Sequence, residues 1–467
     1  MVKIVKPSIA LILIRAEWFS TVIALPAIEE GTQEDANVLI NTLSTYIEID
    51  YQWQVNSIGS LQACIQGLRT AEFDLAVICF QVWAEDFFLK PLVDALAGQP
   101  LAVWCYQPAS HPPRPMPFVD VLRFSGPVGT LEGLGTLRNL GVDYHFIIGA
   151  PDNPRLVQEL YVLAKVMNVR RLLKTAHFGL LPAHNEQMQS TFVDEINLHA
   201  QIGPLIEYLS VSELARLSEE LVKEEIDSYL NNLRQSYRIE GVSDKTLERA
   251  ARASLALAHL AVNHNLDVIS LNDTDDELHR VLGLRPCLYP PLLDQARIMC
   301  GLEGDLGAAT AMFILNLLTS SPCFFVEFWF WDEATNQMVG GHAGMQNPAI
   351  AGPDEPWISR DYEYAQSDPC EGTQFQFVAH PGRVTLLQMR ATPTGWQAIA
   401  AVGEALDLPA WIEGYPHVIL HPDVAVVQFF RQAAKVGTTQ HWIMAYGEVL
   451  TEVEILCRML GVELKII

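Results

Sequence analysis

The chain has 467 residues, half of them hydrophobic, which excludes a disordered protein and allows several sizeable cores. Its 30 Lys and Arg residues are outnumbered by 55 Asp and Glu residues, so the formal net charge is −25. Nucleic acids and anionic membranes bind basic surfaces, and this charge balance argues against both as partners. At roughly 150 residues per domain, the length predicts about three domains.

The cysteines and the apolar runs predict a cytoplasmic location. Eight cysteines are scattered without a C-x-x-C pair, at positions 64, 79, 105, 287, 300, 323, 370 and 457. We expect them to be buried, reduced thiols. The apolar run Ile9–Ile14 is too short for a signal peptide, and the uncharged stretch Leu306–Val326 is broken by polar residues and Pro322. Neither predicts a membrane segment.

In the first third of the chain, apolar runs alternate with helical patterns. Strands are predicted at Ile9–Ile14, Leu75–Phe80, Leu101–Cys105 and Phe146–Gly149, and helices at Glu34–Tyr46 and Asn153–Val166. This order is typical of a parallel sheet that binds ligands beyond the carboxyl ends of its strands. The residues there are Glu17, Trp18, Gln81, Trp83, Tyr106 and Gln107. The glycine-rich stretch Gly126–Leu137 lacks the G-x-G-x-x-G pattern and predicts a turn into a helix.

The middle of the chain predicts a second α/β domain. Strands are predicted at Leu172–Phe178 and Val268–Leu271, and a helix at Leu306–Leu317. Two further helices are expected, one after the Ser210-x-x-Glu213 capping box and one after Ser243 or Asp244.

From Phe324 onward the pattern becomes mostly that of strands. The segments FFVEFWFWD, GRVTLLQM, GWQAIAAVGEAL, HVILH and HWIMAYGEV are separated by Gly, Pro and Asp, with helices at Val424–Ala434 and Glu448–Leu460. The predicted fold class is therefore α/β, with two Rossmann-like three-layer domains and a mostly antiparallel β domain. The predicted boundaries are 1–167, 168–320 and 321–467.

Four residues have polar or charged side chains in sequence contexts where burying such a side chain is costly. Glu327 lies among aromatic residues in F-F-V-E-F-W-F-W, where an unpaired carboxylate would cost several kcal/mol and so needs a cation, a metal or a proton. Glu303 precedes an uncharged helix, His342 lies between glycines, and His441 starts an apolar strand. Their spacing matches no short metal motif. Each alone also fits a structural role: a helix-dipole partner, a buried ion pair, or a hydrogen-bonded core histidine.

Three motifs in order resemble the L-arabinose isomerase and L-fucose isomerase superfamily: E-G-D-L-G-A-A-T-A (303–311), F-F-V-E (324–327) and G-G-H-A-G-M-Q-N-P-A-I-A (340–351). Weaker similarity is seen at 271–279 and 382–386. The resemblance implies that Glu303, Glu327, His342 and His441 bind one Mn²⁺ or another divalent cation. The family has a His-His pair where this chain has Gln440-His441, and this departure bears on the choice of substrate.

The resemblance implies a reaction, aldose–ketose isomerisation. A divalent cation polarises the sugar carbonyl and stabilises an enediolate, while carboxylates move protons. Glu303 and Glu327 would form the catalytic acid/base pair, in an order that the sequence leaves open. Asp305 is expected to orient a ligand or cap the helix, and Asp332 to end a strand in solvent.

The resemblance also implies a homotrimer or homohexamer, with Gln81, Trp83 or Trp18 contacting the site of a neighbouring copy. The partner is a small-molecule sugar that the sequence does not identify. Two alternatives stay open: a metal-binding relative that acts on a modified or sulfonated sugar, and a non-catalytic sugar-binding protein on the same scaffold.

Overall fold

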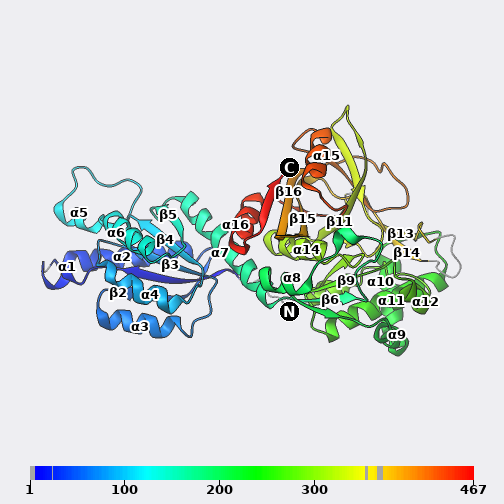
Figure 1. Cartoon of the computed structure of the whole chain (residues 1–467), viewed down its shortest axis with the longest axis horizontal. Helices are drawn as coiled ribbons and strands as arrows, with labels where there is room; N and C mark the ends of the chain where they lie inside the picture. The colour runs from blue at the N-terminus through cyan, green and yellow to red at the C-terminus, as the bar shows by residue number, and fades with distance from the viewer. Residues whose placement is uncertain (1–5, 24, 353–355, 365–371) are drawn as a thin grey trace. The chain divides into compact units, whose positions relative to one another are not determined.

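The computed structural model describes residues 6–23, 25–352, 356–364 and 372–467. Its internal contacts separate two compact units, Val5–Arg171 and Leu172–Ile467. The predicted division into three domains stays a prediction. Each unit is described by itself below (Figure 1).

The first unit is built on a five-stranded parallel sheet in the order β2-β1-β3-β4-β5. Its strands are β1 (Ser8–Ile14), β2 (Glu48–Val55), β3 (Leu75–Phe80), β4 (Leu101–Tyr106) and β5 (His145–Gly149). Its helices are α1 (Trp18–Thr21), α2 (Pro26–Leu43), α3 (Ile58–Leu68), α4 (Leu89–Leu96), α5 (Phe118–Arg123), α6 (Gly126–Asn139) and most of α7 (Pro154–Thr175). The three central strands are wholly buried, as their continuous apolar runs predict.

Three local differences from the predictions have physical reasons. The strand β2 was not predicted, because it is an edge strand with many partly exposed residues. The helix α2 begins at Pro26, a residue suited to the first helical turn. Residues 172–175 end the helix α7 instead of opening a strand, since a short apolar run does not distinguish the two structures.

The glycine-rich stretch forms the helix α6, as predicted, and its glycines serve packing. A Cβ atom added to Gly126 would lie 2.4 Å from the carbonyl oxygen of Tyr106, so only glycine allows the helix to approach the sheet this closely.

The second unit contains a parallel sheet in the order β10-β9-β6-β7. Its strands are β6 (His177–Leu181), β7 (Leu205–Tyr208), β9 (Val268–Leu271) and β10 (Met299–Leu302). The helices are α8 (Glu195–Gln201), α9 (Val211–Glu220), α10 (Lys223–Ser236), α11 (Asp244–Asn263), α12 (Asp276–Leu282), α13 (Pro291–Ala296) and α14 (Leu306–Thr319). Ser210 and Ser243 cap α9 and α11, as predicted. A small sheet joins β8 (Arg238–Glu240), β13 (Trp357–Arg360) and β14 (Thr373–Gln376).

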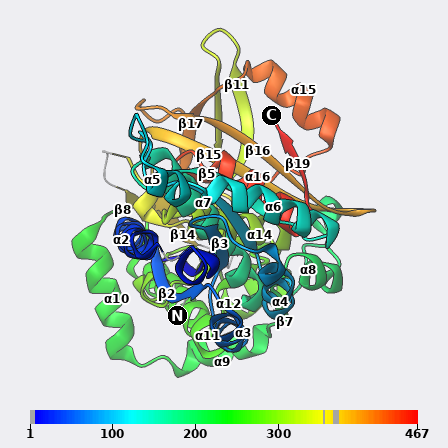
Figure 2. The ribbon, with the colours of Figure 1, turned by 90° about the vertical axis from the view of Figure 1, so that its left-hand side faces the viewer.

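The same unit ends in a barrel-like sheet in the order β15-β18-β11-β12-β17-β16-β19, in which β15 also pairs with β16. Its strands are β11 (Cys323–Asp332), β12 (Gln337–Gly341), β15 (Gly382–Thr392), β16 (Gly395–Ala405), β17 (His417–Pro422), β18 (Trp442–Tyr446) and β19 (Glu463–Ile466), accompanied by α15 (Val426–Val436) and α16 (Leu450–Leu460). All these pairings are antiparallel except that of β16 with β19. The predicted fold class is confirmed. The tip of the β11–β12 hairpin projects from the sheet (Figure 2).

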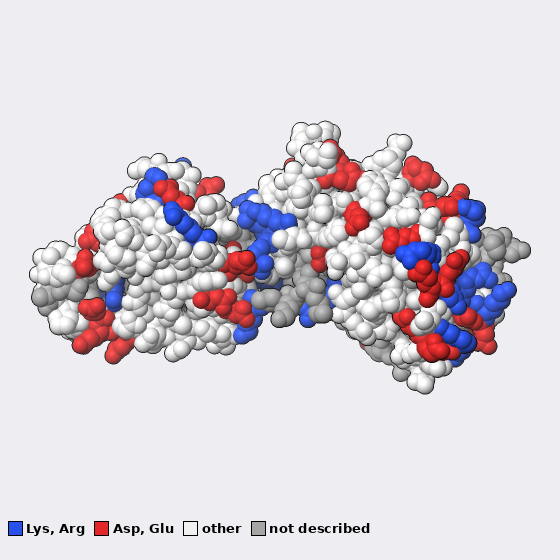
Figure 3. Space-filling view, turned by 90° about the horizontal axis from the view of Figure 1, so that it is seen from below, with Lys and Arg blue, Asp and Glu red and all other residues white. Residues whose placement is uncertain are grey.

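The distribution of charged side chains on the surface agrees with the acidic composition of the chain. On the face seen in Figure 3, basic side chains form small patches interrupted by acidic and uncharged residues. Among the described residues, no helix is both long enough and apolar enough to cross a bilayer. The seven described cysteines are buried and free, as predicted, while Cys370 lies outside the described residues.

Candidate metal and sugar site

Three neighbouring strands of the barrel position three of the four predicted ligands: Glu327 lies in β11, His342 directly follows β12, and His441 directly precedes β18. In the antiparallel pair β11–β12, Glu327 is opposite Gly341, so His342 follows directly beside it. In the pair β11–β18, Val326 is opposite Trp442, which puts His441 at the level of Glu327 on the other side. Strand pairing therefore assembles residues that are far apart in sequence. Gly341 is required because an added Cβ atom would lie 2.1 Å from the carbonyl oxygen of Pro416.

The fourth residue, Glu303, comes from the turn between β10 and α14, at the carboxyl end of the parallel sheet. Its backbone is left-handed, with φ of 56°, and Gly304 follows with φ of 65°. Such a conformation is costly for a glutamate and is typical of functional turns. The helix α14 packs against β15 and β18, which brings this turn to the barrel strands.

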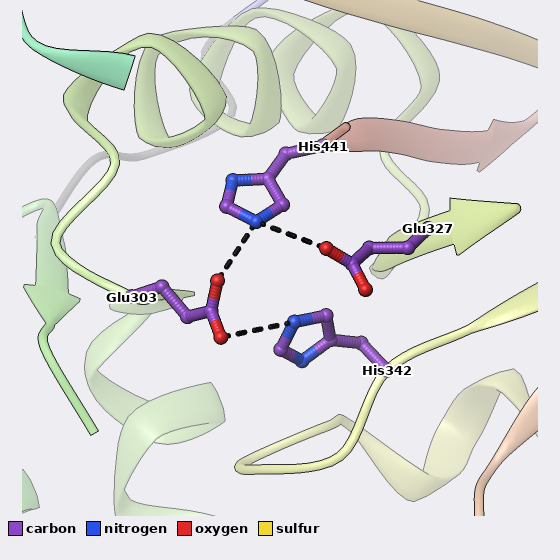
Figure 4. Close-up of side chains that lie close together, drawn as sticks. All are labelled: Glu303, Glu327, His342 and His441. Carbon is purple, nitrogen blue, oxygen red and sulfur yellow. Dashed lines mark ion pairs between the residues drawn. The ribbon is translucent and has the colours of Figure 1, made fainter. Parts of the chain in front are cut away.

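The four side chains converge. One ligand atom from each of Glu303, Glu327, His342 and His441 lies within 4.8 Å of the others, and Figure 4 shows the side chains pointing toward one another. Nε2 of His441 is 2.8 Å from Oε2 of Glu303 and 3.5 Å from Oε1 of Glu327. Nε2 of His342 is 3.6 Å from Oε1 of Glu303.

Two atoms at the centre of this group are buried without a hydrogen bond of good geometry. They are Oε2 of Glu303 and Nε2 of His441, which lie 2.8 Å apart as an ion pair but have no hydrogen-bond partner among the described residues. A buried polar atom without a hydrogen bond is costly. Two carboxylates and two imidazoles with such atoms form a donor set that fits one divalent cation of the Mn²⁺ type.

Both imidazoles are held with Nε2 facing the centre. Nδ1 of His441 is 2.8 Å from Oδ2 of Asp305, and Nδ1 of His342 is 2.8 Å from the carbonyl oxygen of Ala343. When Nδ1 donates its proton to these acceptors, Nε2 keeps its lone pair for a ligand bond. Asp305 also caps α14 by accepting from the backbone N–H of Ala308, which confirms one of the two roles expected for it.

The electrostatics of the four residues are strongly coupled. Burial lowers the pKa of His441, but Asp305, Glu303 and Glu327 raise it, and the net shift is well upward. Burial raises the pKa of Glu303, but His342 and His441 lower it, and the net shift is downward. The pKa of Glu327 is lowered and that of His342 is raised, because for each group the neighbouring opposite charges outweigh the effect of burial. Positive charge is therefore favoured at the centre of the site.

A pocket of about 470 Å³ opens above the four residues. Glu303, Glu327 and His342 contribute to its lining, together with Trp329, Phe330, Ala343, Glu363, Ile412, Glu413 and Tyr415. Its size is in the range of small-molecule sites. The ring of Trp329 contacts that of Tyr415, with 5.2 Å between the centroids, and the Tyr415 hydroxyl donates to Glu363.

Sequence reasoning missed a buried ionic cluster beside the site. Oδ1 of Asp273 accepts from the backbone N–H of Glu303, at 3.2 Å. Arg285, 2% exposed, lies 3.4 Å from Oδ2 of Asp273 and donates to both carboxylate oxygens of Asp361. Asp273 follows β9, at the same sheet edge as Glu303. The rule that parallel sheets bind at the carboxyl ends of their strands would have indicated it.

Of the three residues predicted to contact a neighbouring copy, one is buried at the carboxyl edge of the first sheet. Gln81 is 1% exposed and donates its amide to the carbonyl oxygen of Thr32, so it is not available to a neighbouring copy. Trp18 is 41% exposed, and Trp83 is partly exposed and donates its indole N–H to Glu132.

Replacing Asp305 with asparagine tests its role as a positioning residue. An asparagine keeps the helix cap but removes the negative charge that fixes and polarises His441. We expect Mn²⁺ affinity to fall by about 10- to 100-fold, with little change in the free energy of unfolding. Calorimetric titration and urea denaturation measure the two effects. Unchanged affinity would show that Asp305 serves only the helix.

Comparison with known proteins gives no match to a protein-family model. Curated relatives are found, however, and they are sulfoquinovose isomerases. Those of Priestia aryabhattai and Priestia megaterium are 21% identical over 413 residues, which is 88% of this chain and 90% of each relative. That of Alkalicoccus urumqiensis is 22% identical over 87% of this chain and 88% of its own length. The relatives agree with the predicted enzyme class, an isomerase that interconverts an aldose and a ketose.

Proposed function

We propose that the protein is a divalent-metal-dependent aldose–ketose isomerase of the arabinose and fucose isomerase type. The convergence of Glu303, Glu327, His342 and His441, the first three of which line the pocket, carries this proposal. The sugar isomerases among its relatives support the same class of reaction. The four residues would hold Mn²⁺ or another divalent cation, which supplies Lewis-acid polarisation of the sugar carbonyl.

The two glutamates supply the proton transfers. In the aldose-to-ketose direction, one carboxylate removes the proton from C2 and returns it to C1. The C1 oxygen gains a proton and the C2 hydroxyl loses one, so the overall reaction is an isomerisation without a redox partner. Glu303 and Glu327 both face the pocket, and either carboxylate can therefore reach a sugar bound there. Their order as base and acid is left open.

The charges within the site suit this chemistry. Two carboxylates balance one dication when both imidazoles are neutral. Asp273 and the backbone N–H of Glu303 hold the β10–α14 turn, while Asp305 holds His441. Fixed ligands of this kind cost no reorganisation during the reaction.

Hydrogen isotope exchange tests the proposed function. The protein is incubated in D₂O with Mn²⁺ and a panel of aldoses, and deuterium at C2 is measured by NMR. We expect exchange and ketose formation for at least one aldose, both abolished by a chelator. Bound Mn²⁺ without exchange for any sugar would favour a non-catalytic sugar-binding protein.

The proposed site also predicts how metal affinity depends on pH. The upward pKa shifts of His342 and His441 favour their protonated forms, and a metal must displace these protons. We therefore expect Mn²⁺ to bind more tightly as pH rises through the neutral range, with up to about two protons released per ion. Titrations in buffers of different ionisation enthalpy measure the release. Affinity independent of pH would contradict imidazole ligation.

The homotrimer or homohexamer belongs to the same proposal, with Trp18 and Trp83 as the remaining candidates for contact with a neighbouring copy. Light scattering on the purified protein measures the oligomer size.

A further inference from the structure

The pocket is rich in carboxylates. Four glutamates line it, and among the described lining residues there is no Lys or Arg. The segments 353–355 and 365–371, which lie outside the described residues, contain no Lys or Arg in the sequence. Between Ile298 and Gly382, Arg360 is the single basic residue of the sequence other than histidine, and its guanidinium lies over the ring of Tyr362.

A buried cation that contacts the pocket lining is already neutralised. Arg285 binds Asp361 through two hydrogen bonds, of 2.7 and 3.0 Å, and is also paired with Asp273 and Glu363. One positive charge thus faces three carboxylates. With the dication balancing Glu303 and Glu327, the described residues of this chain that surround the pocket keep a surplus of negative charge.

The pocket lining indicates where a sugar's far end would lie. The reacting carbons C1 and C2 must lie beside Glu303 and Glu327. The remaining carbons then extend toward the other lining residues, which include Trp329, Glu363 and Glu413. Glu413 is exposed on the loop before β17, and no ion pair with a described residue holds its carboxylate. A negative group on the far end of the sugar would meet like charge.

We propose that Glu413, together with Glu363, is a specificity determinant that makes the pocket select sugars with an uncharged far end and reject sulfonated or phosphorylated ones. This inference rests on the proposed function and deepens it. It separates the protein from its relatives, whose name specifies a sulfonated sugar.

The first test compares kcat/KM for an uncharged aldohexose and for its 6-sulfonated counterpart, with the Mn²⁺-loaded protein. We expect the uncharged sugar to be preferred by roughly tenfold or more, and the preference to weaken at high salt. Preference for the sulfonated sugar would overturn the inference and leave the proposed isomerase intact. No turnover of any sugar would contradict the proposed function itself. In that case calorimetry with glucitol and glucitol 6-phosphate still tests charge selection: tighter binding of the anionic alditol overturns it.

The second test reverses the charge of Glu413. In Glu413→Lys, we expect the ratio of kcat/KM for the sulfonated sugar to kcat/KM for the uncharged sugar to rise by roughly tenfold or more. The matched control is Glu454→Lys, which reverses an exposed charge on α16, outside the pocket lining. Equal ratios of the two kcat/KM values in all three proteins would show that Glu413 has no part in selection.

Discussion

Replacing Glu327 with glutamine is expected to abolish tight metal binding and nearly all isomerase activity. Glutamine has the same shape but loses the negative charge that a dication requires, and it is not a base. We expect Mn²⁺ affinity to fall by at least about 100-fold and kcat/KM by about 10³- to 10⁴-fold. Metal titration and the isotope-exchange assay measure the two effects.

The structure indicates that this variant remains folded. Glu327 is partly exposed to the pocket, and its backbone is held by pairing with Gly341 on one side and by the pairing of Val326 with Trp442 on the other. The control is Glu333→Gln, in the exposed turn between β11 and β12, which should retain full metal affinity and activity. If the Glu327 variant binds Mn²⁺ as tightly as the original protein, the ligand assignment is wrong.

Replacing Arg285 with methionine is expected to cause a large loss of stability. The change leaves Asp273 and Asp361, whose side chains are 0% exposed, without their shared cation. Breaking a buried charge pair on one side costs about 3–5 kcal/mol, because the remaining charges stay in a medium of low polarity. Urea denaturation should show a fall of that size in the free energy of unfolding.

The pH dependence of the free energy of unfolding tests the Arg285 substitution in a second way. Burial raises the pKa of Asp273, and loss of Arg285 removes the main interaction that lowers it. A carboxyl whose pKa is raised by folding reduces stability as pH rises between its unfolded and folded values. The decrease in the free energy of unfolding caused by Arg285→Met should therefore become smaller as pH falls toward 4. Arg216→Met, in an exposed pair with Glu220, is the control and should be neutral. Equal effects of the two substitutions would contradict the buried-cluster account.

The fold was predictable where the sequence pattern is strong. Wholly buried strands such as Leu75–Phe80 and Val268–Leu271 are continuous apolar runs, and their bounds were predicted correctly. The edge strand β2 was not recognised because solvent reaches many of its side chains. The end of α7 was misassigned because an apolar run of a few residues fits a helix and a strand equally well.

The candidate site was predictable in its residues but not in its geometry. Through family resemblance, the motifs around Glu303, Glu327 and His342 predicted these residues as metal ligands, and the structure brings them together. Their meeting with His441 depends on the pairing of β11 with β18, which are separated by more than 100 positions, and no local pattern encodes it. The pocket-lining residues Glu413 and Tyr415 lie in an irregular loop, where sequence periodicity carries no information about structure.

Anomalous diffraction at the manganese edge, from crystals grown with Mn²⁺, tests the central claim most directly. One strong peak should lie within coordination distance of Glu303, Glu327 and Nε2 of both His342 and His441. A difference map without a peak there, or with the ion bound elsewhere, would contradict the metal-dependent isomerase.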